Sequence, residues 1–487
     1  SELYGTQEAL LASYADEALL QSGGSVTIPG MYMEEMFLAD MLRWIGVEPD
    51  FVQVGDYKGA SEMLANSSPS PAWEENISQL LDSLYGTMVR ALRTGRDMDR
   101  NAVERALTEC FFADGARAIR VGMIDAEIDR LDLRTHLEDF YGDTVTYDTN
   151  VWKTNADMPD FASMGMFEAF GTMMRMLSET GPRATTRDTI AIVHIDGAIV
   201  DGESSSSFLG TSTVGALTMR KTLKKIEDDD NIKAVIVRIE SPGGSATASE
   251  NIWRGLQRVR EAGKPVWVSV GSMAASGGYY IAVAGERIYV SPSSIVGSIG
   301  VVGGKLAMEG LFDKLRINVV PRTRGPRASM MSGLTPWEDE QRDLIRQRMT
   351  ETYDLFVKRV QAGRDRIDID RTAEGRLFTG DRAVDLRMAD AVGGLQLALA
   401  DLAEETGLLD GEFDVMDYPA PKSFEEVIEE MFGVRGPGGA QADAMLGAVR
   451  AAVGEDAWRQ MQDPLRAMFE MRDQPVLLTM PRALIFR

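Results

Sequence analysis

Two glycine-rich turns carry the residue types that an acyl-transfer site needs. The first reads Ser-Pro-Gly-Gly-Ser at 241–245 and the second reads Ala-Ser-Gly-Gly-Tyr-Tyr at 275–280, each after an apolar, strand-like run. Both open onto a helical pattern, so backbone N–H groups of Gly243, Gly244 and Gly277 can approach an anion at the positive end of a helix dipole. Such paired donors are typical of an oxyanion hole, and a tight strand-to-helix connection is the alternative.

Ser276 stands at the start of the second helical pattern, where its hydroxyl can face a pocket as a nucleophile. Serine is also a favoured helix N-cap, so the position alone leaves both roles open. The two histidines of the chain do not supply an evident base, because His136 lies in a charged stretch and His194 in an apolar strand-like run. We expect both histidines to be structural. Hydrolysis at Ser276 would therefore need another base.

The composition limits the other classes of function. The 487 residues are 44% hydrophobic, enough for about two to four globular domains. The formal net charge of −24 argues against nucleic acid or an anionic membrane as the main partner. Cys110 is the only cysteine, which excludes an intrachain disulfide and a cysteine-based metal site. We expect no metal and no cofactor, and this stretch shows neither a signal-peptide pattern nor an apolar run that could span a membrane.

The apolar patterns predict an α/β fold, because strand-like and helical segments alternate. Strands are expected at residues 189–195, 232–239, 265–270 and 287–290. Helices are expected at residues 214–226, 246–262 and 337–362, the last after the start signal Thr335-Pro336.

The chain also repeats itself at a period of about 265 to 270 residues. Phe112 followed by Ala118-Ile-Arg-Val-Gly-Met-Ile-Asp125 matches Phe378 followed by Ala383-Val-Asp-Leu-Arg-Met-Ala-Asp390. We therefore expect two tandem domains, the first without its opening strands here, because that piece was trimmed or processed or comes from a separate chain. The predicted boundaries are a first domain at 1–146, a Met-rich linker at 147–187 whose residues 161–177 could form an amphipathic helix, a second domain at 188–417 and a C-terminal extension at 418–487.

Three motifs in order give the chain a specific resemblance. They are Ser-Pro-Gly-Gly-Ser-Ala-Thr-Ala-Ser-Glu at 241–250, Ala-Ser-Gly-Gly-Tyr-Tyr at 275–280 and Gly-Ser-Ile-Gly at 297–300. Together they resemble the Ser/Lys protease family that includes signal peptide peptidase A, in its long, duplicated form. The resemblance implies two tandem Clp-protease/crotonase-like domains. It also implies that Ser276 is the nucleophile and that Ser298 orients the lysine.

By the same resemblance the general base is Lys58, which ends the first-domain motif Val54-Gly-Asp-Tyr-Lys58. The duplication supports this assignment. In the first copy Gln7 occupies the position of Ser276, and in the second copy the stretch 322–329, which corresponds to the Lys58 region, contains no lysine. Each half thus keeps the catalytic group that the other half lacks.

Lysine chemistry sets a condition on this assignment. At its reference pKa the amine is neutral in only about one molecule in 2,500 at pH 7, so Lys58 must be buried to act as a base. Neutral Lys58 would accept the Ser276 proton, and N–H groups of Gly243, Gly244 and Gly277 would hold the oxyanion. A nearby carboxylate would raise the lysine pKa, so we expect the Asp56 side chain to point away.

The resemblance implies a serine endopeptidase that degrades remnant signal peptides and other unfolded apolar segments through an acyl-enzyme. It further implies a homotetramer associated with the periplasmic face of the cell inner membrane. Three alternatives stay open at this point. They are a related Ser/Lys protease with other protein targets, a crotonase-like acyl-CoA enzyme that uses the same paired N–H groups without covalent catalysis, and an inactive scaffold.

Overall fold

The computed structural model describes residues 3–31, 33–129, 132–142, 185–206, 212–322, 329–409, 411–419 and 477–479. The chain divides into two compact units, and both are discontinuous in sequence. The larger contains Glu34–Leu80 and Pro182–Leu484, and the smaller contains Ser1–Met33, Leu81–Gly181 and Ile485–Arg487. The helix expected at 161–177 lies outside the described residues.

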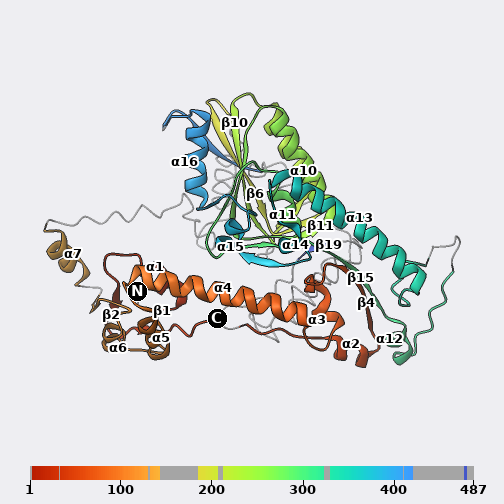
Figure 1. The fold of residues 1–487 in the computed structure, drawn as a ribbon, viewed down its shortest axis with the longest axis horizontal. Helices are drawn as coiled ribbons and strands as arrows, with labels where there is room; N and C mark the ends of the chain where they lie inside the picture. Colours follow the sequence, from red (N-terminus) through yellow and green to blue (C-terminus); the bar gives the residue numbers. More distant parts are fainter. Residues whose placement is uncertain are drawn as a thin grey trace, which may run out of the picture. The chain divides into compact units, whose positions relative to one another are not determined.

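The larger unit is built on a mainly parallel sheet (Figure 1). Its path runs β16-β14-β12-β10-β6-β18, and β13 and β17 continue from β12. The central residues of β10 and β12 are mostly apolar and buried because a parallel sheet is covered on both faces. The bounds are β6 (Thr189–Asp196), β10 (Ile232–Ser241), β12 (Val266–Ala275), β13 (Ile288–Val290), β14 (Ile295–Gly297), β16 (Leu377–Thr379), β17 (Ala391–Val392) and β18 (Asp414–Tyr418).

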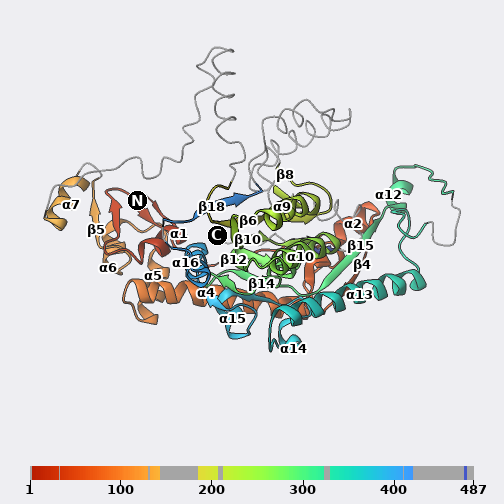
Figure 2. The same cartoon turned by 90° about the horizontal axis from the view of Figure 1, so that it is seen from above.

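Helices cover both faces of this sheet (Figures 1 and 2). On one face Ile190 and Ile236 pack against Leu402 of α16 (Leu395–Thr406). On the other face the neighbouring strand residues, such as Val237, belong to a large cluster to which several helices contribute. These helices include α9 (Ala216–Asp228), α10 (Ala246–Glu261), α11 (Gly277–Ala282) and α13 (Asp339–Gly363). The alternation of side chains along each strand therefore builds two hydrophobic layers.

A second sheet in the larger unit joins distant parts of the chain. Its order is β4-β15-β19-β11-β7-β9-β8. β4 runs antiparallel to β15 from the pair Val54↔Val301 to the pair Glu48↔Ala307. The bounds are β4 (Glu48–Val54), β7 (Ala198–Val200), β8 (Ser205–Ser206), β9 (Ser212–Gly215), β11 (Gly243–Ser245), β15 (Val301–Ala307) and β19 (Leu477–Thr479). Because β4 completes this sheet, residues 34–80 fold with the serine-bearing part and not with the first domain predicted at 1–146.

The smaller unit, described by itself, contains two short parallel strand pairs. β1 (Leu3–Tyr4) pairs with β3 (Ser25–Val26), and β2 (Leu19–Gln21) pairs with β5 (Ala126–Ile128). A core of buried aliphatic residues, including Leu20, joins these strands to the surrounding helices. Helices α1 (Thr6–Ala12), α5 (Arg100–Glu109) and α6 (Gly115–Arg120) contribute to this core, whereas α7 (Leu133–Tyr141) has no buried residue.

Strand registers confirm the duplication predicted from the sequence. Leu3 of β1 pairs with Ser25 as Met273 of β12 pairs with Ile295, both pairs are parallel, and β1 and β12 each lead into a helix. This register corresponds to an offset of 270 residues, which places Thr6, not Gln7, at the position of Ser276. The α/β class and the repeated plan therefore agree with the sequence analysis. The first-copy residue that corresponds to Ser276 is Thr6, one position before the predicted Gln7.

The remaining elements are short except for one helix. α4 (Pro71–Gly95) begins in the larger unit and ends in the smaller. α13 begins at Asp339, after a capping box between Glu338 and Gln341, and not directly after Thr335-Pro336 as predicted. The other elements are α2 (Ala39–Ile45), η1 (Gly59–Ser61), α3 (Glu62–Ala65), α12 (Glu309–Lys314), α14 (Ile369–Thr372) and α15 (Gly380–Asp385).

Candidate active site

Ser276 occupies a sharp turn between β12 and α11. Its backbone has φ +53° and ψ −115°, a conformation that non-glycine residues rarely adopt and that tends to occur at functional positions. The backbone N–H of Ser276 donates to the Gly297 carbonyl at 2.8 Å, which ties the turn to the end of β14. Ser276 is fully buried. A serine on such a turn presents its hydroxyl beyond the end of a strand, as a nucleophile requires.

Lys58 lies within hydrogen-bond distance of this serine. Its Nζ lies 2.7 Å from Oγ of Ser276, although 218 positions separate the two residues in the sequence. The amine also lies 2.9 Å from Oγ of Ser298 and donates to the Ser298 carbonyl at 3.0 Å. Three oxygen atoms therefore hold Nζ, and the three residues named from the sequence come together within the larger unit.

The lysine is in an environment that favours its neutral form. Only 1% of Lys58 is exposed, and burial lowers the pKa of its amine well below the usual value. Desolvation has this effect because an ammonium group loses its hydration when it leaves water. Asp56, two residues earlier, is exposed. This agrees with the expectation that its side chain points away from the amine.

The turn that carries Lys58 is fixed by contacts with residues 373–377. The backbone N–H of Tyr57 donates to the Glu374 carbonyl at 2.9 Å. Gly55 and Gly375 both have positive φ, and at each the neighbouring backbone leaves no room for a side chain. A Cβ atom at Gly375 would lie 2.5 Å from the backbone nitrogen of Lys58. The position of the lysine backbone thus depends on this close approach.

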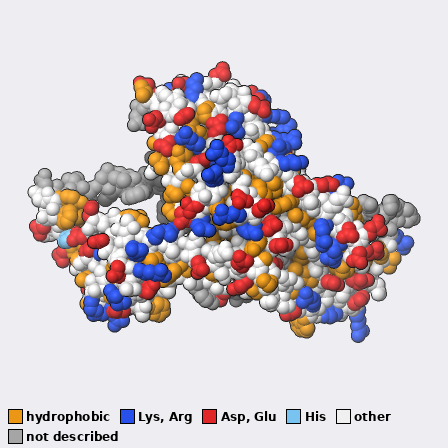
Figure 3. All heavy atoms as spheres, in the orientation of Figure 1, with side chains coloured by type: hydrophobic (Ala, Val, Ile, Leu, Met, Phe, Trp, Pro, Cys, Tyr) orange, Lys and Arg blue, Asp and Glu red, His pale blue; other side chains and the backbone are white. Residues whose placement is uncertain are grey.

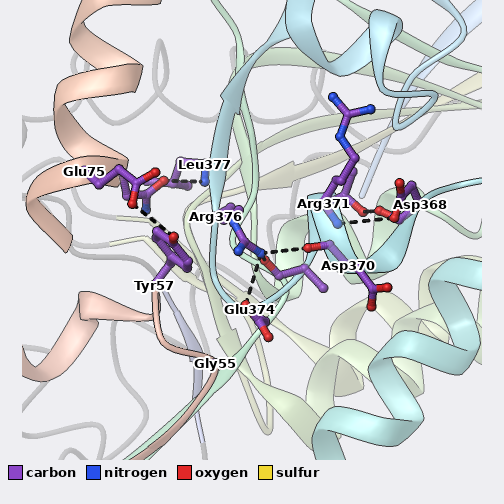
Figure 4. Close-up of polar contacts among 12 residues, drawn as sticks. Gly55, Tyr57, Glu75, Asp368, Asp370, Arg371, Glu374, Arg376 and Leu377 are labelled. Carbon is purple, nitrogen blue, oxygen red and sulfur yellow. Dashed lines mark hydrogen bonds and ion pairs between the residues drawn. The ribbon is translucent and has the colours of Figure 1, made fainter. Parts of the chain in front are cut away.

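Polar side chains support the same turn (Figure 4). The Tyr57 hydroxyl donates to Glu75 at 3.1 Å, and the Arg376 guanidinium lies 4.1 Å from the centroid of the Tyr57 ring. Arg376 also forms an ion pair with Glu374 at 3.2 Å and donates to the Asp370 carbonyl at 3.2 Å. These residues hold the tyrosine that precedes the lysine.

The two glycine turns lie next to each other, as the sequence predicts. A Cβ atom at Gly277 would be 3.2 Å from the nitrogen of Gly244 and 3.3 Å from Cα of Gly243. The N–H of Gly243, however, donates to Oγ of Ser241 at 3.1 Å within its own turn. Of the three N–H groups predicted to hold an oxyanion, that of Gly243 is therefore already engaged within its own turn.

Comparison with known families decides which group this arrangement belongs to. The model of peptidase family S49 matches residues 4–140 and 258–409, and a Clp protease model matches residues 210–296. The chain belongs to peptidase family S49. Its S49 match covers both copies of the repeat.

Several relatives of this S49 chain carry the names of proteases. Protease 4 of Haemophilus influenzae is 29% identical over 81% of this chain and 62% of its own length. Protease 4 of Salmonella typhi is 27% identical over 95% of this chain and 70% of its own length. A putative signal peptide peptidase SppA of Enterococcus faecium is 29% identical over 50% of this chain and 72% of its own length. The chain thus spans just under two thirds of the Haemophilus relative.

Some residues of the S49 site were not expected from the sequence. The Lys58 turn depends on Gly375 and Arg376, which lie in the stretch Ala-Glu-Gly-Arg at 373–376 outside the three motifs. A glycine after a charged residue is a weak turn signal, so only the fold reveals this contact. Glu250, the last residue of the first motif, accepts from the Tyr280 hydroxyl at 2.6 Å and pairs with Arg359 at 2.7 Å. Glu250 thereby links α10, α11 and α13, and α11 is the helix that begins directly after Ser276.

The histidines lie apart from the serine and lysine. His194 Nε2 is 2.7 Å from Asp417 and His136 Nε2 is 2.8 Å from Glu17. His194 faces the edge strand β18, and its side chain is 41% exposed, so the expected apolar strand is correct but this position of it is not buried. Within the described ranges, no group of three or more His, Cys, Asp or Glu residues is arranged to hold a metal ion.

Proposed function

We propose that this chain is a serine endopeptidase in which Ser276 is the nucleophile and Lys58 is the general base. One observation carries the proposal: a buried amine with a strongly lowered pKa lies 2.7 Å from the serine hydroxyl. A neutral amine at hydrogen-bond distance can accept the hydroxyl proton, whereas a solvated lysine would be protonated. Membership of peptidase family S49 supports the same reaction.

The reaction proceeds through an acyl-enzyme. The Ser276 oxygen attacks a peptide carbonyl while its proton passes to Nζ of Lys58. Backbone N–H groups of Gly244 and Gly277 stabilise the oxyanion, and the lysine then gives the proton to the leaving amine. Water enters, loses a proton to the same amine and releases the acyl group. Ser298 holds Nζ in line through its carbonyl and hydroxyl.

The proposed substrates are remnant signal peptides and other unfolded apolar segments. The name of the Enterococcus relative points to the first of these. We further propose a homotetramer at the periplasmic face of the cell inner membrane, which rests on the family resemblance alone. Across the described part of the chain, no helix has the length and apolar character needed to cross a membrane. Figure 3 shows acidic and basic side chains intermixed on one face, and nucleic acid is not a proposed partner.

The test is covalent labelling together with peptide cleavage. A fluorophosphonate probe should label Ser276, as found by peptide mass mapping, and an apolar signal-peptide sequence should be cleaved. A crotonase-like acyl-CoA enzyme would leave the probe unreacted and the peptide intact. Reaction with the probe but cleavage only of other protein targets would favour the related protease, and absence of both reactions would contradict the proposal and fit either a crotonase-like enzyme or an inactive scaffold.

The pH dependence of activity should report the amine. Lys58 acts as a base only when uncharged, so kcat/KM should rise with pH and level off above the pKa of Lys58. Because burial lowers that pKa, the midpoint should lie well below the 10.5 of an ordinary lysine. The measurement is a pH profile of kcat/KM on one peptide. A midpoint at the ordinary lysine value would contradict the assignment.

Gly375→Ala should lower activity by displacing Lys58. The added Cβ atom would lie 2.5 Å from the backbone nitrogen of Lys58, so the turn must shift. A shift of about 1 Å at a catalytic group costs on the order of 100-fold in rate. Gly407→Ala is the matched control, because Gly407 also has positive φ but a Cβ atom there would meet nothing within 4 Å. Equal kcat/KM for the two variants would show that the contact does not position the lysine.

A further inference from the structure

Asn76 is a buried polar residue to which the mechanism above gives no part. It lies in the first part of α4, and only 3% of it is exposed. Its Oδ1 accepts a hydrogen bond from the backbone N–H of Leu377 at 3.0 Å. Among the described residues no partner is found for its Nδ2. The asparagine therefore supplies one acceptor, to a backbone segment 301 positions away in the sequence.

The peptide group that Asn76 contacts leads directly to Ser298. Leu377 begins β16, where it pairs with Gly297 of β14. The carbonyl of Arg376 accepts from the N–H of Ser298 at 2.7 Å. The Arg376 carbonyl and the Leu377 N–H belong to one planar peptide group, so they turn together. The bond from Leu377 to Asn76 therefore also orients the carbonyl that holds Ser298.

Ser298 depends on such support because of its backbone conformation. Its φ is +53°, a value that a residue with a side chain keeps only when its surroundings impose it. The Ser298 carbonyl and hydroxyl contact Nζ of Lys58 at 3.0 and 2.9 Å. The carbonyl of the preceding Gly297 accepts from the N–H of Ser276 at 2.8 Å. A rotation of the 297–298 turn would therefore disturb the contacts of both proposed catalytic groups.

The residue before Asn76 supports the lysine from another direction. Glu75 accepts from the hydroxyl of Tyr57, which directly precedes Lys58 (Figure 4). Glu75 and Asn76 thus connect the same turn of α4 to the lysine segment and to the strand that holds Ser298. All of these residues belong to the larger unit. Of the two contacts, the one made by Asn76 is buried, whereas the one made by Glu75 is exposed.

We propose that Asn76 is a positioning residue for the serine and lysine. It acts through the Arg376–Leu377 peptide group, which fixes Ser298 and thereby keeps Nζ of Lys58 in line with Oγ of Ser276. This inference rests on the proposed peptidase function, because it assigns to Asn76 a part in the same proton transfer. Asn76 does not exchange a proton itself, since an amide side chain is neither an acid nor a base near neutral pH.

Asn76→Leu removes the acceptor and keeps a side chain of similar size. A displacement of about 1 Å at a catalytic group costs on the order of 100-fold, so kcat should fall about 10- to 100-fold. KM should stay within about twofold, because the loss concerns the chemical step and not substrate binding. Fluorophosphonate labelling of Ser276 should slow by the same factor as kcat. Unchanged kcat and an unchanged labelling rate would overturn the positioning role and leave the peptidase function standing.

Asn101→Leu is the matched control, because it is the same substitution at an exposed position of α5. It should leave kcat, KM and Tm nearly unchanged. The activity of Asn76→Leu is measured well below its own Tm, so that only folded protein is compared. If that variant does not fold, Asn76→Ala, which also lacks the acceptor, takes its place.

Asn76→Asp tests whether the acceptor oxygen is the feature that matters. The side chain keeps its shape and an oxygen for the Leu377 N–H, and it loses only the Nδ2 donor that has no partner among the described residues. Its kcat should therefore exceed that of Asn76→Leu at least about fivefold. Equal kcat in the two variants would show that the hydrogen bond to Leu377 does not position the site.

Hydrogen exchange tests the connection without any activity. In the unchanged chain the amides of Ser298 and Leu377 are hydrogen-bonded and should exchange slowly. In Asn76→Leu, peptides that cover residues 295–300 and 374–379 should exchange faster, whereas Asn101→Leu should match the unchanged chain. If this occurs but no variant cleaves a peptide, the proposed function fails and the connection stands. Equal exchange of both peptides in all three proteins would overturn the connection, whatever the activity.

Discussion

Ser276→Ala is expected to lower kcat by at least about a thousandfold, because the acyl-enzyme cannot form without the hydroxyl. Ser276 is fully buried and lies 2.7 Å from the Lys58 amine, so another serine could take its place only if the turn moved. Ser298 Oγ also contacts Nζ, but it follows β14 and is not on the turn between β12 and α11. The measurement is the initial rate of peptide cleavage.

Ser272→Ala is the control for this experiment. Ser272 lies on the same strand, β12, and its side chain is exposed. Its hydroxyl donates to Glu240 and is not among the oxygen atoms that contact the lysine amine, so kcat should stay within about twofold of the unchanged chain. Substantial cleavage by Ser276→Ala, or an equal loss in both variants, would remove Ser276 from the role of nucleophile.

Lys58→Met is expected to abolish cleavage to a similar extent and to raise stability at the same time. Methionine fills a similar volume but cannot accept a proton, so attack by the serine loses its base. In the folded chain burial lowers the lysine pKa, whereas in the unfolded chain the pKa is ordinary. The unfolded state therefore binds more protons in the range between the two values, and stability rises with pH across that range. At neutral pH the buried amine costs stability, and its removal should raise Tm.

The exposed Lys233 supplies the control for Lys58→Met. Its side chain is 42% exposed and contributes an ion pair with Asp188, so Lys233→Met should leave both cleavage and Tm nearly unchanged. Thermal unfolding followed between pH 7 and 10 would measure the stability effect. Loss of activity with a lower Tm in Lys58→Met would indicate a structural lysine and not a catalytic base.

The local parts of the fold were predictable from the sequence. The runs at 232–239 and 246–262 became β10 and α10 because their apolar patterns match the faces that the core covers. The start of α13 was misplaced, since the capping box at Glu338 competes with the proline signal at Pro336. Short-range patterns thus identify elements better than they identify their ends.

The assembly of the site was predictable only through the resemblance and the repeat. No local signal in Glu48–Val54 shows that this strand pairs with Val301–Ala307, because a pairing across about 250 positions depends on the whole fold. The predicted first domain, residues 1–146, therefore contained residues 34–80, which fold with the serine-bearing part. The engagement of the Gly243 N–H with Ser241 and the strand formed by Leu477–Thr479 likewise follow from backbone geometry that no motif encodes.

The pairing of β4 with β15 has a consequence for biosynthesis. Ser276 is synthesised 218 positions after Lys58, so under the proposed mechanism a ribosome-bound fragment that ends before Ser276 contains the base without the nucleophile. The proposed catalytic pair can therefore form only late, after long-range β pairing that is inherently slow. Other nascent chains on the same polysome would therefore not be cleaved by this protein before its fold is complete.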